Sequence, residues 1–147
     1  MGSINFNCEK ILVIYIFIDP GSKKFGWAIY KNDVLLEHCF YKKEDFKDFI
    51  ISYMEKYKEI QIIIGDGTSH KYYCNIIKTD FSDIKIDLIN EKYSTEQARK
   101  LYFKHNPPKG WKKFIPKSCL VPNEEYDDYT AMILAERYFK NHNVIPK

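Results

Sequence analysis

Short apolar runs alternate along the chain with segments whose apolar residues recur at helical spacing, and these patterns predict strands and helices. The apolar runs predict strands at 11–18, 26–31, 34–41, 61–65 and 85–90. The helical spacing predicts helices at 44–58, 71–78, 94–105 and 124–140. A long loop at 106–123 separates the last two helices, because Pro107 and Pro108 cannot continue the first of them.

The order of these elements predicts the architecture. The first three strands are joined by short turns and should form an antiparallel meander. The fourth and fifth strands each follow a helix, and such crossovers place them parallel to the first strand. We therefore expect one α/β domain over 1–147, with a five-stranded mixed sheet, the first strand at its centre and helices on both faces. The carboxyl ends of the three parallel strands then share one edge, where ligands bind in open α/β sheets.

Acidic residues stand at that edge. Asp19, Asp66 and Glu91 each lie at the carboxyl end of one of the three parallel strands. Neighbouring strands are about 4.8 Å apart, so these carboxylates would repel one another unless a cation lay between them. Oxygen ligands without nearby histidine or cysteine spacing favour Mg²⁺ or Mn²⁺ over zinc. A pair of such ions can activate a water and stabilise the leaving oxygen of a phosphodiester.

The last predicted helix offers further carboxylates. Glu124 and Asp127 are three positions apart and share a helix face, whereas Asp128 points about 100° away from Asp127. Only one of Asp127 and Asp128 can therefore face the strand ends. Each acid alone has a simpler interpretation as a turn residue, a surface ion pair or helix-terminal charge. Three strand ends and one helix together favour a metal site.

Composition and charge narrow the functional classes only slightly. The hydrophobic content of 45% in 147 residues excludes wholesale disorder. The net charge of +3 permits a polyanionic partner without demanding one. The four cysteines form no C-x-x-C pair, which indicates reduced thiols. The 11–18 run is shorter than the roughly 20 residues that span a bilayer and lacks signal-peptide features, so we expect a cytoplasmic protein without a membrane partner.

Several lysines occupy positions where they could contact a nucleic acid. Lys23 and Lys24 lie at a hairpin tip beside Asp19 and are expected to contact phosphates. The 106–123 loop interleaves lysines with aromatic residues that could stack on unpaired bases or pack against the protein as a hydrophobic plug. Its candidate nucleic-acid contacts are Lys109, Trp111, Lys112, Lys113 and Lys117.

Four stretches resemble the RuvC/YqgF group of Holliday-junction-resolvase-like nucleases, within the ribonuclease H-like superfamily. They appear in the order of the family and span most of the chain. The stretches are Ile18-Asp19-Pro20-Gly21 with Gly26 and Ala28, Ile64-Gly65-Asp66-Gly67-Thr68, Asn90 to Ala98, and Tyr126 to Ala131.

This resemblance implies a ribonuclease H-like fold and a Mg²⁺- or Mn²⁺-dependent endonuclease that acts on structured nucleic acid. The strand-one aspartate of the family falls on Asp19, its glutamate on Glu91 and its last-helix acid on Asp127, since Thr130 and Ala131 then match a pair of small residues. Asp66 departs from the commonest pattern. Members differ in substrate, from branched DNA to precursors of ribosomal RNA, and junction cutters often act as pairs, which allows a homodimer.

Two other functions fit the same residues. The first is a nucleic-acid-binding module without catalysis, which some members of the group resemble. The second is a kinase or ATPase of the actin-like kind, whose phosphate loop also places an acid and glycines after a first strand. Those enzymes close two domains over a nucleotide, whereas this chain has room for one.

Overall fold

The structure is a computed structural model that describes residues 13–92, 94–107 and 127–141, with the side chains of Thr95 and Asp127 outside the description. The elements are β1 (Ile14–Asp19), β2 (Lys24–Lys31), β3 (Val34–Lys42), a 3-10 turn (Lys43–Asp45), α1 (Phe46–Lys56), β4 (Ile60–Gly65), α2 (His70–Asp80), β5 (Lys85–Ile89), α3 (Ser94–His105) and α4 (Asp127–Asn141). No helix in these ranges is both long and apolar enough to cross a membrane.

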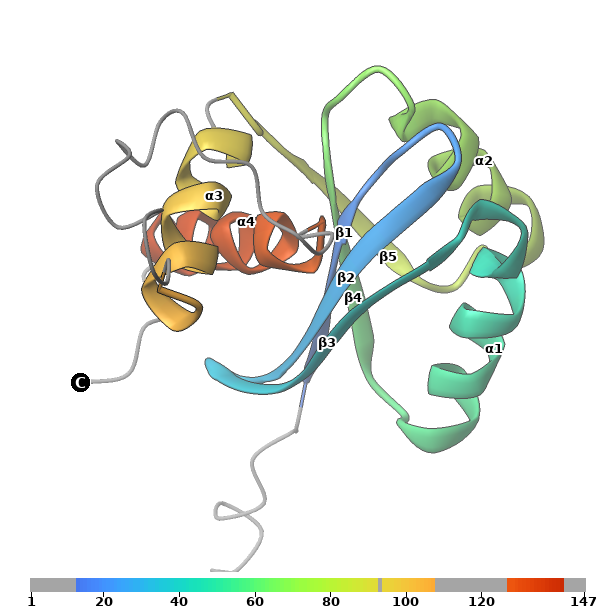
Figure 1. Ribbon diagram of the computed structural model, residues 1–147. Coiled ribbons are helices and arrows are strands. Elements are labelled where there is room, and N and C mark those ends of the chain that lie inside the picture. The colour runs from blue at the N-terminus through green and yellow to red at the C-terminus, as the bar shows by residue number, and fades with distance from the viewer. Residues whose placement is uncertain (1–12, 93, 108–126, 142–147) are drawn as a thin grey trace, which may run out of the picture.

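The strands form one five-stranded mixed sheet in the order β3-β2-β1-β4-β5 (Figure 1). The pairs β1–β2 and β2–β3 are antiparallel, whereas β1–β4 and β4–β5 are parallel. This confirms the predicted meander, the two crossovers and the central position of β1. The carboxyl ends of β1, β4 and β5 lie toward the upper end of the sheet in Figure 1.

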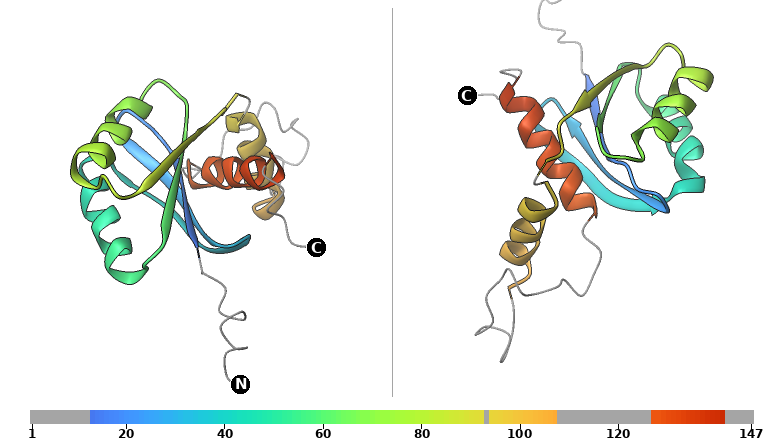
Figure 2. Two further views of the ribbon diagram at one scale, coloured as in Figure 1. Left: turned by 180° about the vertical axis from the view of Figure 1, so that it is seen from behind. Right: turned by 90° about the horizontal axis from the view of Figure 1, so that it is seen from above.

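Helices cover both faces of the sheet, as Figure 2 shows from two further directions. On one face α1 and α2 enclose a core that includes Ile16, Trp27 and Tyr73. On the other face α4 packs on Phe17 and Ala28, with α3 beside it. Strand β1 contributes to both cores, which explains why its sequence is apolar without alternation.

Small residues let α4 approach the sheet closely. Ala28 in β2 and Ala131 and Ala135 in α4 are all fully buried. Short side chains at such a contact reduce the distance between helix axis and sheet while keeping the interior densely packed. These alanines belong to the core between α4 and the sheet, together with larger residues such as Phe17 and Tyr138, and α4 carries several of the groups discussed below.

Several element boundaries differ from the prediction. Strand β2 begins at Lys24, because Asp19 pairs with Gly26 and the pairing continues to the hairpin. Helix α1 begins only at Phe46, since 43–45 form a 3-10 turn. Helix α2 is longer than expected and runs from His70 to Asp80. Residues 11–12, 108–126 and most of the predicted 106–123 loop lie outside the described part of the chain.

Candidate active site

The carboxylate of Glu91 lies against two glycines, Gly65 and Gly67, whose missing side chains leave room for it. A Cβ added at Gly65 would fall on Oε2 of Glu91, and one added at Gly67 would fall on Oε1. Leu134 of α4 closes the same space, with its Cδ1 3.2 Å from the position of a Gly65 Cβ. The two glycines therefore form a cradle in which the Glu91 carboxylate rests against the backbone of β4.

Asp19 belongs to the same face of the sheet. Ile18 pairs with Ile64 in the parallel β1–β4 ladder, so Asp19 and Gly65 are the next positions along the two strands. Side chains alternate between faces along a strand, and Phe17, two residues before Asp19, packs under α4. The register thus places Asp19 beside the strand position on which the Glu91 carboxylate rests.

Asp66 supports the turn that carries Glu91. Its backbone N–H donates to the carbonyl oxygen of Ile89 at 2.9 Å, which extends the pairing of β4 and β5 by one bond. Its Oδ1 accepts the backbone N–H of Glu91 at 3.2 Å. The side chain of Asp66 is exposed, so its observed contact is structural.

The surroundings of Glu91 disfavour its charged form. Burial raises the pKa of Glu91 above its ordinary value, and the nearby Asp66 raises this pKa further. Electrostatic interactions with His70 and Arg137 lower this pKa. Oε2 of Glu91 is buried and has no hydrogen-bond partner among the described residues. A buried acceptor without a partner costs free energy, and a bound cation would remove that cost.

Two basic side chains donate hydrogen bonds to the segments around the glycine cradle. The ring of His70 donates through Nδ1 to the carbonyl oxygen of Gly67 at 2.6 Å, which fixes the glycine loop. Arg137 of α4 donates to the carbonyl oxygen of Asn90 at 2.9 Å and to Oε1 of Gln97 at 2.8 Å.

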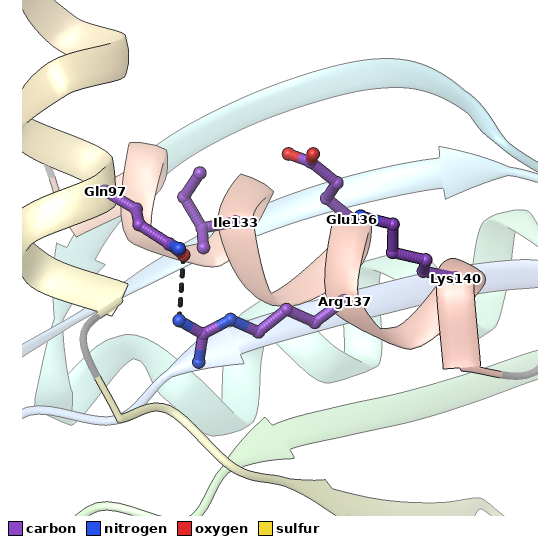
Figure 3. A pocket seen from close by; sticks show the side chains of 5 residues that line it. All are labelled: Gln97, Ile133, Glu136, Arg137 and Lys140. Carbon is purple, nitrogen blue, oxygen red and sulfur yellow. Dashed lines mark hydrogen bonds between the residues drawn. The ribbon is translucent and has the colours of Figure 1, made fainter.

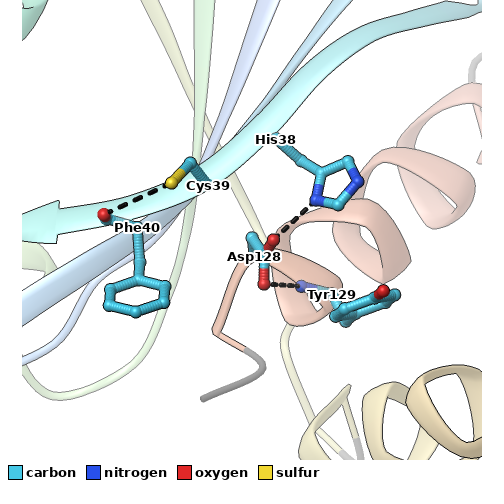
Figure 4. Close-up of polar contacts among 5 residues, drawn as sticks. All are labelled: His38, Cys39, Phe40, Asp128 and Tyr129. Atoms are coloured by element: carbon cyan, nitrogen blue, oxygen red, sulfur yellow. Dashed lines mark hydrogen bonds and ion pairs between the residues drawn. The ribbon is translucent and has the colours of Figure 1, made fainter. Parts of the chain in front are cut away.

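The first turn of α4 has a different arrangement. Asp128 is only 8% exposed, and its Oδ2 accepts a hydrogen bond from Nδ1 of His38 in β3 at 2.5 Å (Figure 4). Its Oδ1 accepts the backbone N–H of Tyr129 at 3.1 Å. Both carboxylate oxygens of Asp128 therefore have hydrogen-bond partners within the protein.

The remaining predicted acids are only partly described. The backbone of Asp127 begins α4, but its side chain lies outside the description, as does Glu124. Among the side chains that the structure does describe, no three acidic, histidine or cysteine groups lie close enough together to hold one ion. The structure thus places Glu91, Asp66 and Asp19 at one edge and directs Asp128 toward His38.

The described residues nevertheless suit a hard divalent cation. The unpartnered Oε2 of Glu91 is an oxygen ligand of the kind that Mg²⁺ and Mn²⁺ prefer. The oxygen lies over Gly65 beside Leu134, and Asp19 stands on the adjacent strand. Glu91 and Asp19 are the described residues that would hold such an ion.

Lysines gather beside Asp19. Lys24 pairs with Lys42 in the β2–β3 ladder, and the backbone N–H of Lys43 donates to the carbonyl oxygen of Lys23 at 2.9 Å. Lys23, Lys24, Lys42 and Lys43 therefore share the edge of the sheet where Asp19 stands. The predicted contacts Lys109, Trp111, Lys112, Lys113 and Lys117 lie outside the described residues.

Known proteins resemble this chain in structure and not in sequence. No protein-family model matches the sequence, and no curated protein matches it significantly. The structure of T. thermophilus RuvC in complex with a Holliday junction substrate is similar, with a TM-score of 0.51 and 10% identity, over 90% of this chain and 97% of that one. The fold is ribonuclease H-like, of the RuvC type. A second Thermus thermophilus RuvC structure has a TM-score of 0.48 and 10% identity over 89% of this chain and 97% of that one.

Sequence reasoning missed the residues that support the site in this RuvC-like fold. His38 carries no motif, and its partner Asp128 is 90 positions away. Arg137 is 47 positions from Asn90. Lys42 and Lys43 could have been found, because a hairpin brings the end of its second strand back to the start of its first. No comparable signal exists for His38 or Arg137.

Proposed function

We propose that the protein is a divalent-metal-dependent endonuclease that cleaves structured nucleic acid. The observation that carries this proposal is the buried, unpartnered Oε2 of Glu91, held over Gly65 beside the strand that ends in Asp19. A buried carboxylate oxygen without a hydrogen-bond partner weakens a fold unless a ligand compensates for it. The RuvC-like fold agrees with a nuclease, because a protein of that fold has been solved with a Holliday junction substrate.

We assign Asp19, Glu91 and Asp127 as the metal ligands. Asp127 is preferred to Asp128 because the carboxylate of Asp128 is engaged by His38, and adjacent helix positions point about 100° apart. Asp66 holds the Glu91 turn through a backbone N–H and is therefore assigned a supporting role. Glu124, which lies outside the described residues, remains a further candidate ligand.

The surroundings of Glu91 would assist metal-dependent cleavage. Divalent cations, when bound, would activate a water and stabilise the leaving oxygen of the phosphodiester. Glu91 enters that site with its carboxylate already fixed against backbone, so little side-chain freedom is lost on binding. Leu134 packs beside the cradle and excludes water from one side, which strengthens the attraction between the carboxylate and a cation.

The substrate class follows from the lysines. The backbones of Lys23, Lys24, Lys42 and Lys43 lie along the edge that presents Asp19, and their side chains would neutralise phosphates flanking the cleaved bond. Without nucleic acid, the ammonium groups of Lys24 and Lys43 lie over the rings of Phe40 and Tyr72. The RuvC side of the sequence resemblance favours a four-way DNA junction, and the YqgF side favours a structured RNA. Symmetric cleavage of a junction would require a homodimer, which sedimentation of the protein on and off the substrate would detect.

A cleavage assay tests the proposal. The wild type is incubated with Mn²⁺ or with a chelator, side by side on a four-way DNA junction and on a folded RNA. We expect metal-dependent product from one of them, and its loss in Asp19→Asn and Glu91→Gln. Asp33→Asn is the matched control, because this acid lies in the β2–β3 turn at the opposite end of the sheet. Full activity of the Asp19→Asn variant would refute the assigned site.

A non-catalytic nucleic-acid-binding module is the second candidate. It is favoured by the lack, among the described side chains, of three metal-binding groups in one place. This function predicts binding that weakens with salt, survives Asp19→Asn and Glu91→Gln together, and never yields product in Mn²⁺.

A further inference from the structure

Arg137 connects α4 to the chain on both sides of Glu91. Its NH1 donates to the carbonyl oxygen of Asn90, the residue immediately before Glu91, at 2.9 Å. Its NH2 donates to Oε1 of Gln97 in α3, the helix that follows Glu91, at 2.8 Å (Figure 3). One side chain therefore spans the turn that presents the candidate metal ligand.

The other hydrogen bonds that the structure describes in this turn act differently. The backbone N–H of Lys92 donates to Oδ1 of Asn90 at 2.7 Å, and that of Ser94 donates to the carbonyl oxygen of Glu91 at 2.9 Å. Both bonds are internal and shape the turn without fixing it to the rest of the protein. The Glu91 N–H donates to Oδ1 of the exposed Asp66 at 3.2 Å, and the acceptors of Arg137, Asn90 and Gln97, are exposed as well. Arg137 supplies the attachment to a packed helix.

The chemistry of the guanidinium suits this function. Its planar fork presents two N–H groups in fixed directions, which a flexible lysine ammonium cannot do. Hydrogen bonds with a charged donor are shorter and stronger than those between neutral groups. A bond to the carbonyl of Asn90 fixes the plane of the peptide that joins Asn90 to Glu91. Rotation of that peptide would swing the Glu91 side chain away from its glycine cradle.

We propose that Arg137 is a positioning residue, which holds the Asn90–Glu91 peptide so that the Glu91 carboxylate stays over Gly65 and Gly67 in a metal-binding position. The inference rests on the proposed function, because it takes Glu91 to be a ligand. Arg137 itself binds neither metal nor substrate. Its positive charge also offsets part of the negative charge that Asp66 and Glu91 bring together.

The surroundings of Arg137 make the inference testable by chemical rescue. Its guanidinium borders an open pocket of about 290 Å³ between α3 and α4, lined by Gln97, Ile133, Glu136, Arg137 and Lys140 (Figure 3). Truncation of Arg137 would enlarge this pocket and leave the Asn90 carbonyl without its donor. A free guanidinium ion is small enough to enter from solvent and to supply the missing N–H groups.

The experiment measures Mn²⁺ affinity by calorimetry, independently of any cleavage. We expect Arg137→Ala to weaken binding by about 10–100-fold, as the loss of residues that orient metal ligands typically does. Arg137→Lys should give an intermediate loss. Lys140→Ala is the matched control, because it removes a positive charge from the same helix and the same pocket. Guanidinium chloride, below denaturing concentrations and against equal sodium chloride, should restore affinity to Arg137→Ala and leave Lys140→Ala unchanged.

Each outcome has a distinct meaning. Wild-type affinity in Arg137→Ala, or an equal loss in Lys140→Ala, would overturn the inference and leave the proposed function intact. No Mn²⁺ binding by the wild type would overturn the proposed function itself. If Arg137→Ala does not fold, hydrogen exchange of the Ser94 amide in Arg137→Lys decides: faster exchange than in the wild type supports the positioning role, and equal exchange contradicts it.

Discussion

Asp128 and Glu91 are two acidic side chains near α4 that meet opposite surroundings. Asp128, in the first turn of the helix, is buried and accepts a short hydrogen bond from His38. Glu91 lies beside Gly65, where Leu134 of the same helix packs, and its buried Oε2 has no partner among the described residues. We propose that the first carboxylate stabilises the fold and that the second binds a metal ion. Four measurements test this difference between Asp128 and Glu91.

The largest effect is expected on metal affinity. Glu91→Gln removes the charge that attracts the cation, so the Mn²⁺ dissociation constant should rise by more than about 100-fold, beyond the loss typical of supporting residues. Isothermal titration calorimetry measures it. An unchanged dissociation constant would mean that Glu91 is not a metal ligand and that its unpartnered Oε2 does not bind the ion.

The next effect concerns stability. Asp128→Ala leaves His38 without its acceptor and should lower the free energy of unfolding by about 1–3 kcal/mol. His38→Ala should cost a similar amount, and the double variant should cost less than the sum, because both changes remove one interaction. Urea unfolding of the four proteins gives the coupling. Strict additivity would show that the pair contributes nothing of its own.

A smaller effect should follow from filling the glycine cradle. Gly67→Ala places a Cβ on Oε1 of Glu91, so the carboxylate must move and metal affinity should fall about tenfold. The variant Ser69→Ala, two residues along the same loop, serves as the control. In a Glu91→Ala background the clash is absent, and Gly67→Ala should then leave stability unchanged. Equal destabilisation in both backgrounds would contradict the cradle.

The smallest effect is a gain in stability. Burial and Asp66 raise the pKa of Glu91, so its ionised form costs stability at neutral pH and its protonated form does not. Glu91→Gln should therefore stabilise the metal-free protein at neutral pH, by at most about 1 kcal/mol because the side chain is partly exposed. The gain should disappear as the pH falls below the ordinary pKa of a glutamate. Thermal unfolding at neutral and acidic pH, without metal, checks both the sign and the trend.

Much of this arrangement could be predicted because it depends on local pattern. The apolar runs gave the five strands, and the crossover rule gave the parallel trio of β1, β4 and β5. The positions of Asp19, Asp66 and Glu91 at one edge followed directly. The predicted boundaries of β2 and α1 were less accurate. Strand pairing in the hairpin extends β2, and a 3-10 turn precedes α1, and neither can be recognised from the spacing of apolar residues.

The sequence by itself determined the order of the sheet and the edge at which its acids stand, since side-chain periodicity and chain connectivity are encoded within short segments. Only the tertiary structure decided which acid has a partner. The pairing of His38 with Asp128, and of Arg137 with the carbonyl of Asn90, depends on the direction in which α4 crosses the sheet. That direction is set by the packing of α4 on the sheet, in a core that includes Phe17, Ala28, Leu134 and Tyr138 and joins segments about a hundred residues apart.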